Sequence, residues 1–246
     1  MGRRYANPPI EEAVCEFRLT AETRWDLTVP GLLYEKLKGQ FPEKEQRMAQ
    51  EVELIHGPEG LQQQIRTSER LLFFTKDRKM LVQIGPRILA VNVLKPYPQW
   101  ETFKRAIEMA WTNLQSAIEV QGLERIGLRY INRIEFPVPG ELADYFDFYP
   151  FVGKRLPQQI VNFLAVVEFA YNNDRDRCRL QLASVPTSGT EGKAACILDL
   201  DYFLARPRSI LPSETLGWID EAHNRVEELF EGCITDKLRK MFEEIL

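Results

Sequence analysis

The stretch RIGLRYINRIEF at residues 125–136 alternates apolar and polar side chains along its length. In an extended strand, one face would carry Ile126, Leu128, Tyr130, Ile134 and Phe136. The other face would carry Arg125, Arg129, Ile131, Arg133 and Glu135. Because successive side chains of a strand point to opposite sides of the sheet, this stretch predicts a long strand with one buried face and one polar face.

The preceding residues predict elements that fit such a strand. An apolar stripe at three- and four-residue steps predicts a helix that starts at Trp100 and lies on a sheet; the stripe consists of Phe103, Ile107, Trp111, Leu114 and Ile118. We also expect a strand at 10–19 and a short helix at 30–41. Further strands are expected at 49–56, 61–68, 71–76, 79–84 and 88–94.

The second half repeats this order of elements more loosely. After the strand at 125–136 we expect a short helix at 141–148, strands at 160–171, 177–185 and 194–204, and one long helix from Ser213 to Phe242. The predicted fold class is therefore α+β, with a pseudo-duplicated β-α-β(4–5)-α order in halves 1–123 and 124–246 of one compact unit. Antiparallel sheets backed by long helices, as in TBP-like or helix-grip folds, suit this order; a polar-faced β-barrel is the alternative.

Composition excludes several classes of protein. The 246 residues carry a net charge of −4, which argues against nucleic acid as a partner. We find no apolar stretch of membrane-spanning length and no signal peptide, so we expect a cytoplasmic protein without a membrane partner. The cysteines form no C-x-x-C pair and are expected to be reduced core residues; they are Cys15, Cys178, Cys196 and Cys233.

Signatures of catalysis are scarce in the sequence. His56 falls in an expected turn and His223 on the apolar stripe of the last helix, so acid–base chemistry would depend on carboxylates. No catalytic residue is assigned, no cofactor is required, and enzymatic activity stays undecided with a preference against it.

Charged residues on the expected strands allow two interpretations. Arg125, Arg129 and Arg133 could bind a phosphate-containing ligand together with Glu16 and Arg18. Asp199 and Asp201 could then hold Mg²⁺ through oxygen ligands. Alternatively, the same residues form cross-strand ion pairs on the solvated face of a sheet, which we consider the stronger interpretation.

The segment YFDFYPF at residues 145–151 is unusually aromatic. Aromatic residues are enriched at protein interfaces, so it is a candidate partner interface composed of Tyr145, Phe146, Phe148, Tyr149 and Phe151. It could equally pack back onto a sheet edge.

Several motifs resemble those of a sporadically distributed bacterial family of uncharacterised proteins of similar length. They are NPPIEEAVCEF at 7–17, NVLKPYPQW at 92–100, RIGLRYINRI at 125–134 and AHN at 222–224 with Phe230. The resemblance implies no reaction. The family's patchy distribution is typical of accessory genes, such as phage-defence or toxin–antitoxin systems.

These observations lead to ranked expectations about function. The first is a non-catalytic binding or adaptor protein of a bacterial accessory system that holds a protein partner, with homodimerisation also open. The alternative is a metal-dependent enzyme or sensor of a phosphate-containing small molecule. Glu16-Phe17-Arg18 is similar to part of the Glu-x-Glu-x-Lys motif of triphosphate tunnel enzymes but lacks its second glutamate. DNA binding by a TBP-like sheet is the least favoured.

Overall fold

The protein is described by a computed structural model covering residues 3–57, 60–187, 189 and 192–245, with side chains outside 49–68. Its centre is a nine-stranded antiparallel sheet of strand order β3-β4-β5-β6-β2-β7-β10-β9-β8. In chain order these strands are β2 (Ile10–Leu19), β3 (Glu43–Gly57), β4 (Gly60–Phe74), β5 (Met80–Gly85), β6 (Ile88–Leu94), β7 (Leu123–Pro137), β8 (Leu164–Tyr171), β9 (Asp176–Val185) and β10 (Lys193–Leu204). The short strands β1 (Arg4–Tyr5) and β11 (Glu244–Ile245) pair separately and bring the two ends of the chain together.

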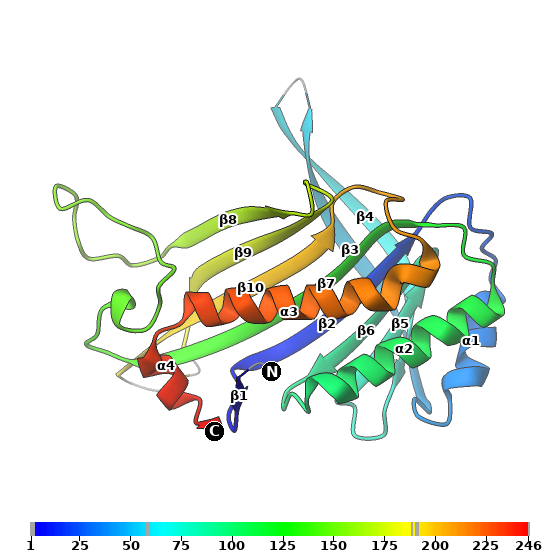
Figure 1. The fold of residues 1–246 in the computed structure, drawn as a ribbon, viewed down its shortest axis with the longest axis horizontal. Helices are drawn as coiled ribbons and strands as arrows, with labels where there is room; N and C mark the ends of the chain where they lie inside the picture. Colours follow the sequence, from blue (N-terminus) through cyan, green and yellow to red (C-terminus); the bar gives the residue numbers. More distant parts are fainter. Residues whose placement is uncertain (1–2, 58–59, 188, 190–191, 246) are drawn as a thin grey trace.

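Two long helices cover one face of the sheet (Figure 1). They are α2 (Trp100–Ala117) and α3 (Thr215–Cys233). The shorter helices are α1 (Val29–Leu37) and α4 (Asp236–Met241), and single 3₁₀ turns occur at η1 (Leu142–Asp144) and η2 (Pro212–Glu214). No helix in the described part of the chain is long and apolar enough to cross a membrane.

The alternation of β2 places its apolar side chains under the helices. Ala13, Cys15 and Phe17 are fully buried, and the Phe17 ring stacks on Trp111 of α2 with 4.6 Å between centroids. Stacked aromatic rings add to the stabilisation that burial itself provides. One hydrophobic core therefore runs beneath α2 and α3 and includes residues from both halves of the chain.

The two halves have matching topology. β2 pairs with β6 in the first half and β7 pairs with β10 in the second, so the first strand of each half pairs with its last. The pairing of β2 with β7 joins the halves into one sheet. The predicted α+β class and antiparallel pairing are confirmed, and the sheet is open and does not close into a barrel.

Four of the predicted elements differ from the structure. The expected strands 61–68 and 71–76 form the single strand β4, because β3 pairs with it in unbroken register through Ala49↔Ser68 and Arg47↔Arg70. The expected helix 141–148 is reduced to η1, because the chain after it turns inward to bury aromatic side chains. The last helix ends at Cys233, where Ile234 becomes extended and forms a β-bridge with Phe146.

Candidate functional site

The predicted polar residues do lie together, on the sheet face opposite to α2 and α3. Arg129 donates from Nε and Nη2 to Asp199 at 2.8 and 2.5 Å. Arg125 donates from Nη2 to both carboxylate oxygens of Asp201, at 2.9 and 2.8 Å. Arg129 and Asp199 thus form a bidentate pair between β7 and β10, and Arg125 binds Asp201 through one nitrogen, so both guanidinium groups already have protein carboxylates as partners.

The other predicted ligand-binding residues are also held by neighbours in the chain. Arg18 donates from Nε to Glu16 at 2.7 Å, and Glu16 lies 3.5 Å from Arg125. Arg133 donates to the backbone oxygen of Pro186 at 2.6 Å. This face therefore has the cross-strand charge pairing that stabilises a solvated sheet.

The two aspartates expected to hold Mg²⁺ are occupied by arginines. Asp199 and Asp201 each bind an arginine, as described above. Among the described residues, no group of three or more histidine, cysteine, aspartate or glutamate side chains is placed to hold a metal ion.

The aromatic segment is divided between the core and the surface. Tyr145 and Phe146 are buried, with Tyr145 packing on Phe136 at 4.6 Å between ring centroids. The expectation that they form an exposed interface is therefore corrected: they fill the core beside β7. Phe148 is half-buried against the core. Tyr149 and Phe151 are exposed, Phe151 by 88%.

The same exposed apolar character continues into β8, the edge strand that follows this segment. Its side chains are LAVVEFAY, and both faces of the strand are accessible. Val167 and Phe169 pair with Leu180 and Cys178 of β9. The two β9 residues are buried in the core, whereas their two β8 partners are exposed at the edge of the sheet. The single charge, Glu168, is paired with Arg177 of β9 at 3.0 Å.

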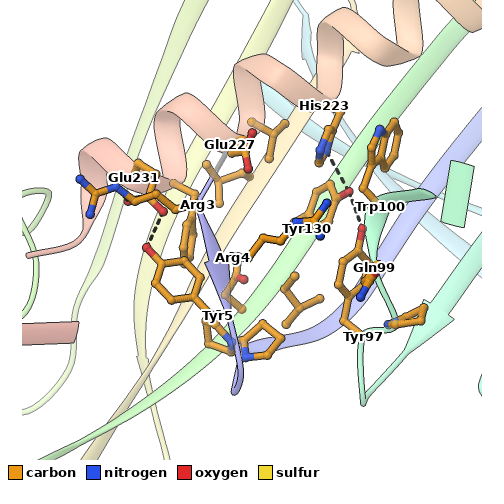
Figure 2. Close-up of a pocket in the computed structure, with 18 of the residues that line it drawn as sticks. Arg3, Arg4, Tyr5, Tyr97, Gln99, Trp100, Tyr130, His223, Glu227 and Glu231 are labelled. Carbon is orange, nitrogen blue, oxygen red and sulfur yellow. Dashed lines mark hydrogen bonds and ion pairs between the residues drawn. The ribbon is translucent and has the colours of Figure 1, made fainter. Parts of the chain in front are cut away.

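A pocket lies on the helical face, between α2, α3 and the N-terminal strand β1 (Figure 2). Its volume is about 560 Å³, within the range of small-molecule sites. Its floor includes Tyr130 and Asn132 of β7. Its aromatic lining residues are Tyr5, Tyr97, Trp100, Tyr130 and Phe230.

A chain of neutral groups forms one wall of this pocket. The Tyr97 and Tyr130 hydroxyls are 3.1 Å apart, and the Tyr130 hydroxyl lies 3.3 Å from His223 Nδ1. The His223 ring stacks on Trp100 with 3.9 Å between centroids. Burial disfavours the imidazolium and lowers the pKa of His223 to about 4, so this histidine is neutral at physiological pH.

Both arginines at the pocket already have carboxylate partners. Arg3 lies 3.1 Å from Glu244, and Arg4 lies 3.4 Å from Glu101 in the first turn of α2. The positive charge of each arginine is thus balanced by a glutamate carboxylate.

The two glutamates that α3 presents to the pocket differ in their partners. Glu231 accepts a hydrogen bond from the Tyr5 hydroxyl at 2.5 Å and from Arg239 Nε at 2.9 Å. Glu227 forms no ion pair with any residue in the described part of the chain. Burial, reinforced by the nearby Glu231, raises the pKa of Glu227.

No pattern in the sequence predicts this pocket. The sequence places His223 on the apolar stripe of the last helix and Tyr130 on the apolar face of its strand, and both positions are typical of core residues. One residue that could have indicated a polar site on this face is Asn132, a polar side chain on the otherwise apolar face of the RIGLRYINRIEF stretch. In the structure Asn132 is buried and donates to the backbone oxygen of Leu198 at 3.1 Å.

No protein-family model matches this chain, and no curated protein matches it.

Proposed function

We propose that the protein is a non-catalytic adaptor that holds a protein partner by pairing an extended segment of that partner with β8. The observation that carries this proposal is the composition of β8, which exposes Leu164, Val166, Val167 and Phe169 at the edge of the sheet. An edge strand presents unpaired backbone donors and acceptors, and peptide strands bind to such edges through main-chain hydrogen bonds.

The opposite edge of the sheet shows how an edge is normally protected. There, β3 begins with Glu43, Lys44 and Glu45, and these two glutamates are paired with Arg78 of the β4–β5 turn. Charged side chains on an edge discourage pairing with another chain. Because β8 lacks this protection, it is the edge suited to receiving a strand.

A partner of different sequence fits β8 better than a second copy of the chain. Antiparallel self-pairing centred on Glu168 would place two glutamates opposite each other, which is destabilising. Self-pairing centred on Val167 would place exposed Val161 beside Asn173, in the polar turn of the other copy. We therefore favour a partner segment of different sequence, with apolar residues on the face that would lie on the same side of the sheet as α3. Such a partner would belong to an accessory system of the kind that the sequence resemblance implies.

The phosphate-binding alternative has weaker support. Arg129 is bound bidentately by Asp199, and Arg125 donates from one nitrogen to both oxygens of Asp201, so a phosphate would have to displace carboxylates that are already well placed.

The experiment is selection from a displayed library of random ten-residue peptides, followed by titration of synthetic copies of the selected sequences. We expect alternating apolar sequences that bind the wild-type protein and lose at least tenfold in affinity on Val167→Lys or Val166→Lys. The control is Leu32→Lys, which adds a lysine at an exposed leucine of α1 far along the chain from β8.

Two further measurements make the test decisive. Methylating alternate backbone nitrogens of a selected peptide should abolish binding, because strand pairing needs those donors. All variants should unfold at the wild-type temperature. The proposal fails if no peptide is selected, if selected peptides tolerate both β8 lysines, or if light scattering shows a wild-type dimer that Val167→Lys dissociates.

A further inference from the structure

The pocket between α2 and α3 is a second feature, separate from β8 and independent of the adaptor proposal. From its aromatic walls and its charge balance, we infer that it binds an organic cation, with the Glu227 carboxylate as the counter-ion.

The charge balance of the lining points to a positively charged ligand. Its charged members are Arg3, Arg4, Glu101, Glu227 and Glu231, while His223 is neutral. Arg4 is paired with Glu101, Arg3 with Glu244, and Glu231 with Arg239. Glu227 has no ion-pair partner in the described part of the chain, although the positive charge of Arg4 acts on it. Figure 2 shows Glu227 on α3 above the pocket, between His223 and Glu231.

The N-terminus of α2 also opens onto this pocket, and helix N-termini favour anions. Here, however, Glu101 occupies the first turn of α2 and compensates that positive end. Glu101 therefore offsets part of the positive charge on the α2 side, whereas Glu227 on the α3 side forms no ion pair with any described residue.

The aromatic residues of the pocket would bind the cation through their ring faces. Trp100 and Tyr97 stand at the α2 side, and Tyr5 and Phe230 at the β1–α3 side. Aromatic faces attract ammonium groups through the ring quadrupole, and Trp and Tyr do so most strongly. Trp100 is held in place by stacking on His223, so its position is determined before a ligand arrives. A cation with an apolar body fits such walls better than a hydrated metal ion does.

The test uses three organic cations of increasing apolar size, which are tetramethylammonium and the protonated amines benzylamine and tryptamine. Calorimetric titration should detect binding of at least one of them at millimolar concentration or below. The matched neutral and anionic probes are tryptophol and indole-3-propionate, which keep the indole ring and its two-carbon chain and replace the ammonium group by a hydroxyl or a carboxylate. We expect tryptamine to bind at least tenfold more tightly than tryptophol, and indole-3-propionate not to bind.

Three variants locate the site. Glu227→Gln should weaken amine binding at least tenfold, whereas Glu228→Gln should leave it unchanged. The Glu228 side chain is 65% exposed and paired with Arg225, so this variant removes the same charge from the same helix outside the pocket. Arg4→Gln should tighten amine binding severalfold, because it removes a nearby positive charge.

The opposite results would overturn the inference. The inference fails if none of the three cations binds, or if tryptamine and tryptophol bind with equal affinity. It also fails if Glu227→Gln retains binding, or if Arg4→Gln weakens it. Wild-type melting temperatures of the unliganded variants, or higher ones, would exclude misfolding as the cause of lost binding. Lysine substitutions in β8 should not change amine binding, so this inference and the adaptor proposal can fail separately.

Discussion

Trp218 Nε1 on α3 donates a hydrogen bond to Asp176 Oδ1 at the start of β9, at 2.8 Å, and the Asp176 side chain is fully buried. The other carboxylate oxygen accepts from Arg175 Nη2 and from Asn172 Nδ2, both at 2.7 Å. A buried carboxylate is stable only when such donors replace water. This residue therefore fixes the beginning of α3 to the sheet, and with it the helix that forms one side of the pocket.

The first prediction concerns this buried carboxylate. Asp176→Ala should lower the free energy of unfolding by about 3–5 kcal/mol, because it leaves the Trp218 and Arg175 donors without their acceptor. Denaturant unfolding measures the change. Asp220→Ala is the control, since Asp220 pairs with Lys104 in a partly exposed position and should cost about 1 kcal/mol or less. A cost below about 1 kcal/mol for Asp176→Ala would show that the network does not hold α3.

The second prediction concerns the pair formed by Arg129 and Asp199. The Asp199 side chain is only 10% exposed, so Arg129→Ala leaves a nearly buried carboxylate without its bidentate partner. We expect a loss of about 1–3 kcal/mol in Arg129→Ala and a smaller loss than the sum of the single changes in the double variant with Asp199→Ala. A double-mutant cycle of unfolding measurements tests this. Additive losses would mean that the pair contributes nothing as a pair.

The third prediction is a pH dependence that originates at His223. Its pKa is about 4 in the folded protein and about 6.5 in an unfolded chain. Between these values the unfolded chain binds a proton that the folded protein does not, so acidification from pH 6.5 to pH 4 favours unfolding. The loss should reach about 2–3 kcal/mol at the acid end of this window.

Comparison of wild type with His223→Gln isolates this contribution, because glutamine does not titrate. The difference in unfolding free energy between the two proteins should be largest above pH 6.5 and shrink as the pH falls towards 4. A constant difference across this range would contradict the assignment of a neutral, buried imidazole.

The short-range patterns of the sequence account for much of the fold. The alternation in RIGLRYINRIEF predicted β7, and the apolar stripe after Trp100 predicted α2 with its observed start. The prediction was wrong where tertiary contacts override local preference. Residues 141–148 are one example, because burial of Tyr145 and Phe146 against Phe136 stops helix formation after η1.

The sites were less predictable than the elements. The alternation of the sequence predicted that Arg125, Arg129 and Arg133 lie on one face of a strand. Which residues of the neighbouring strands pair with these arginines depends on the order and register of the strands. That register sets Asp201 beside Arg129 and Asp199 beside Ile131, and the side chains then pair diagonally. The exposure of β8 likewise follows from its place at the end of the sheet, which its apolar sequence alone does not reveal.

The sequence by itself therefore determined the α+β class, the faces of the central strands and the two long helices, because each depends on residues close together in the chain. Only the tertiary structure decided which polar groups are satisfied and which are left open. Tyr5, Trp100, Tyr130 and Glu227 come from four separate elements and form a pocket only after the helices have packed on the sheet. The unpaired state of Glu227 and the uncovered edge at β8 are results of that packing, since both depend on what lies next to a residue in space.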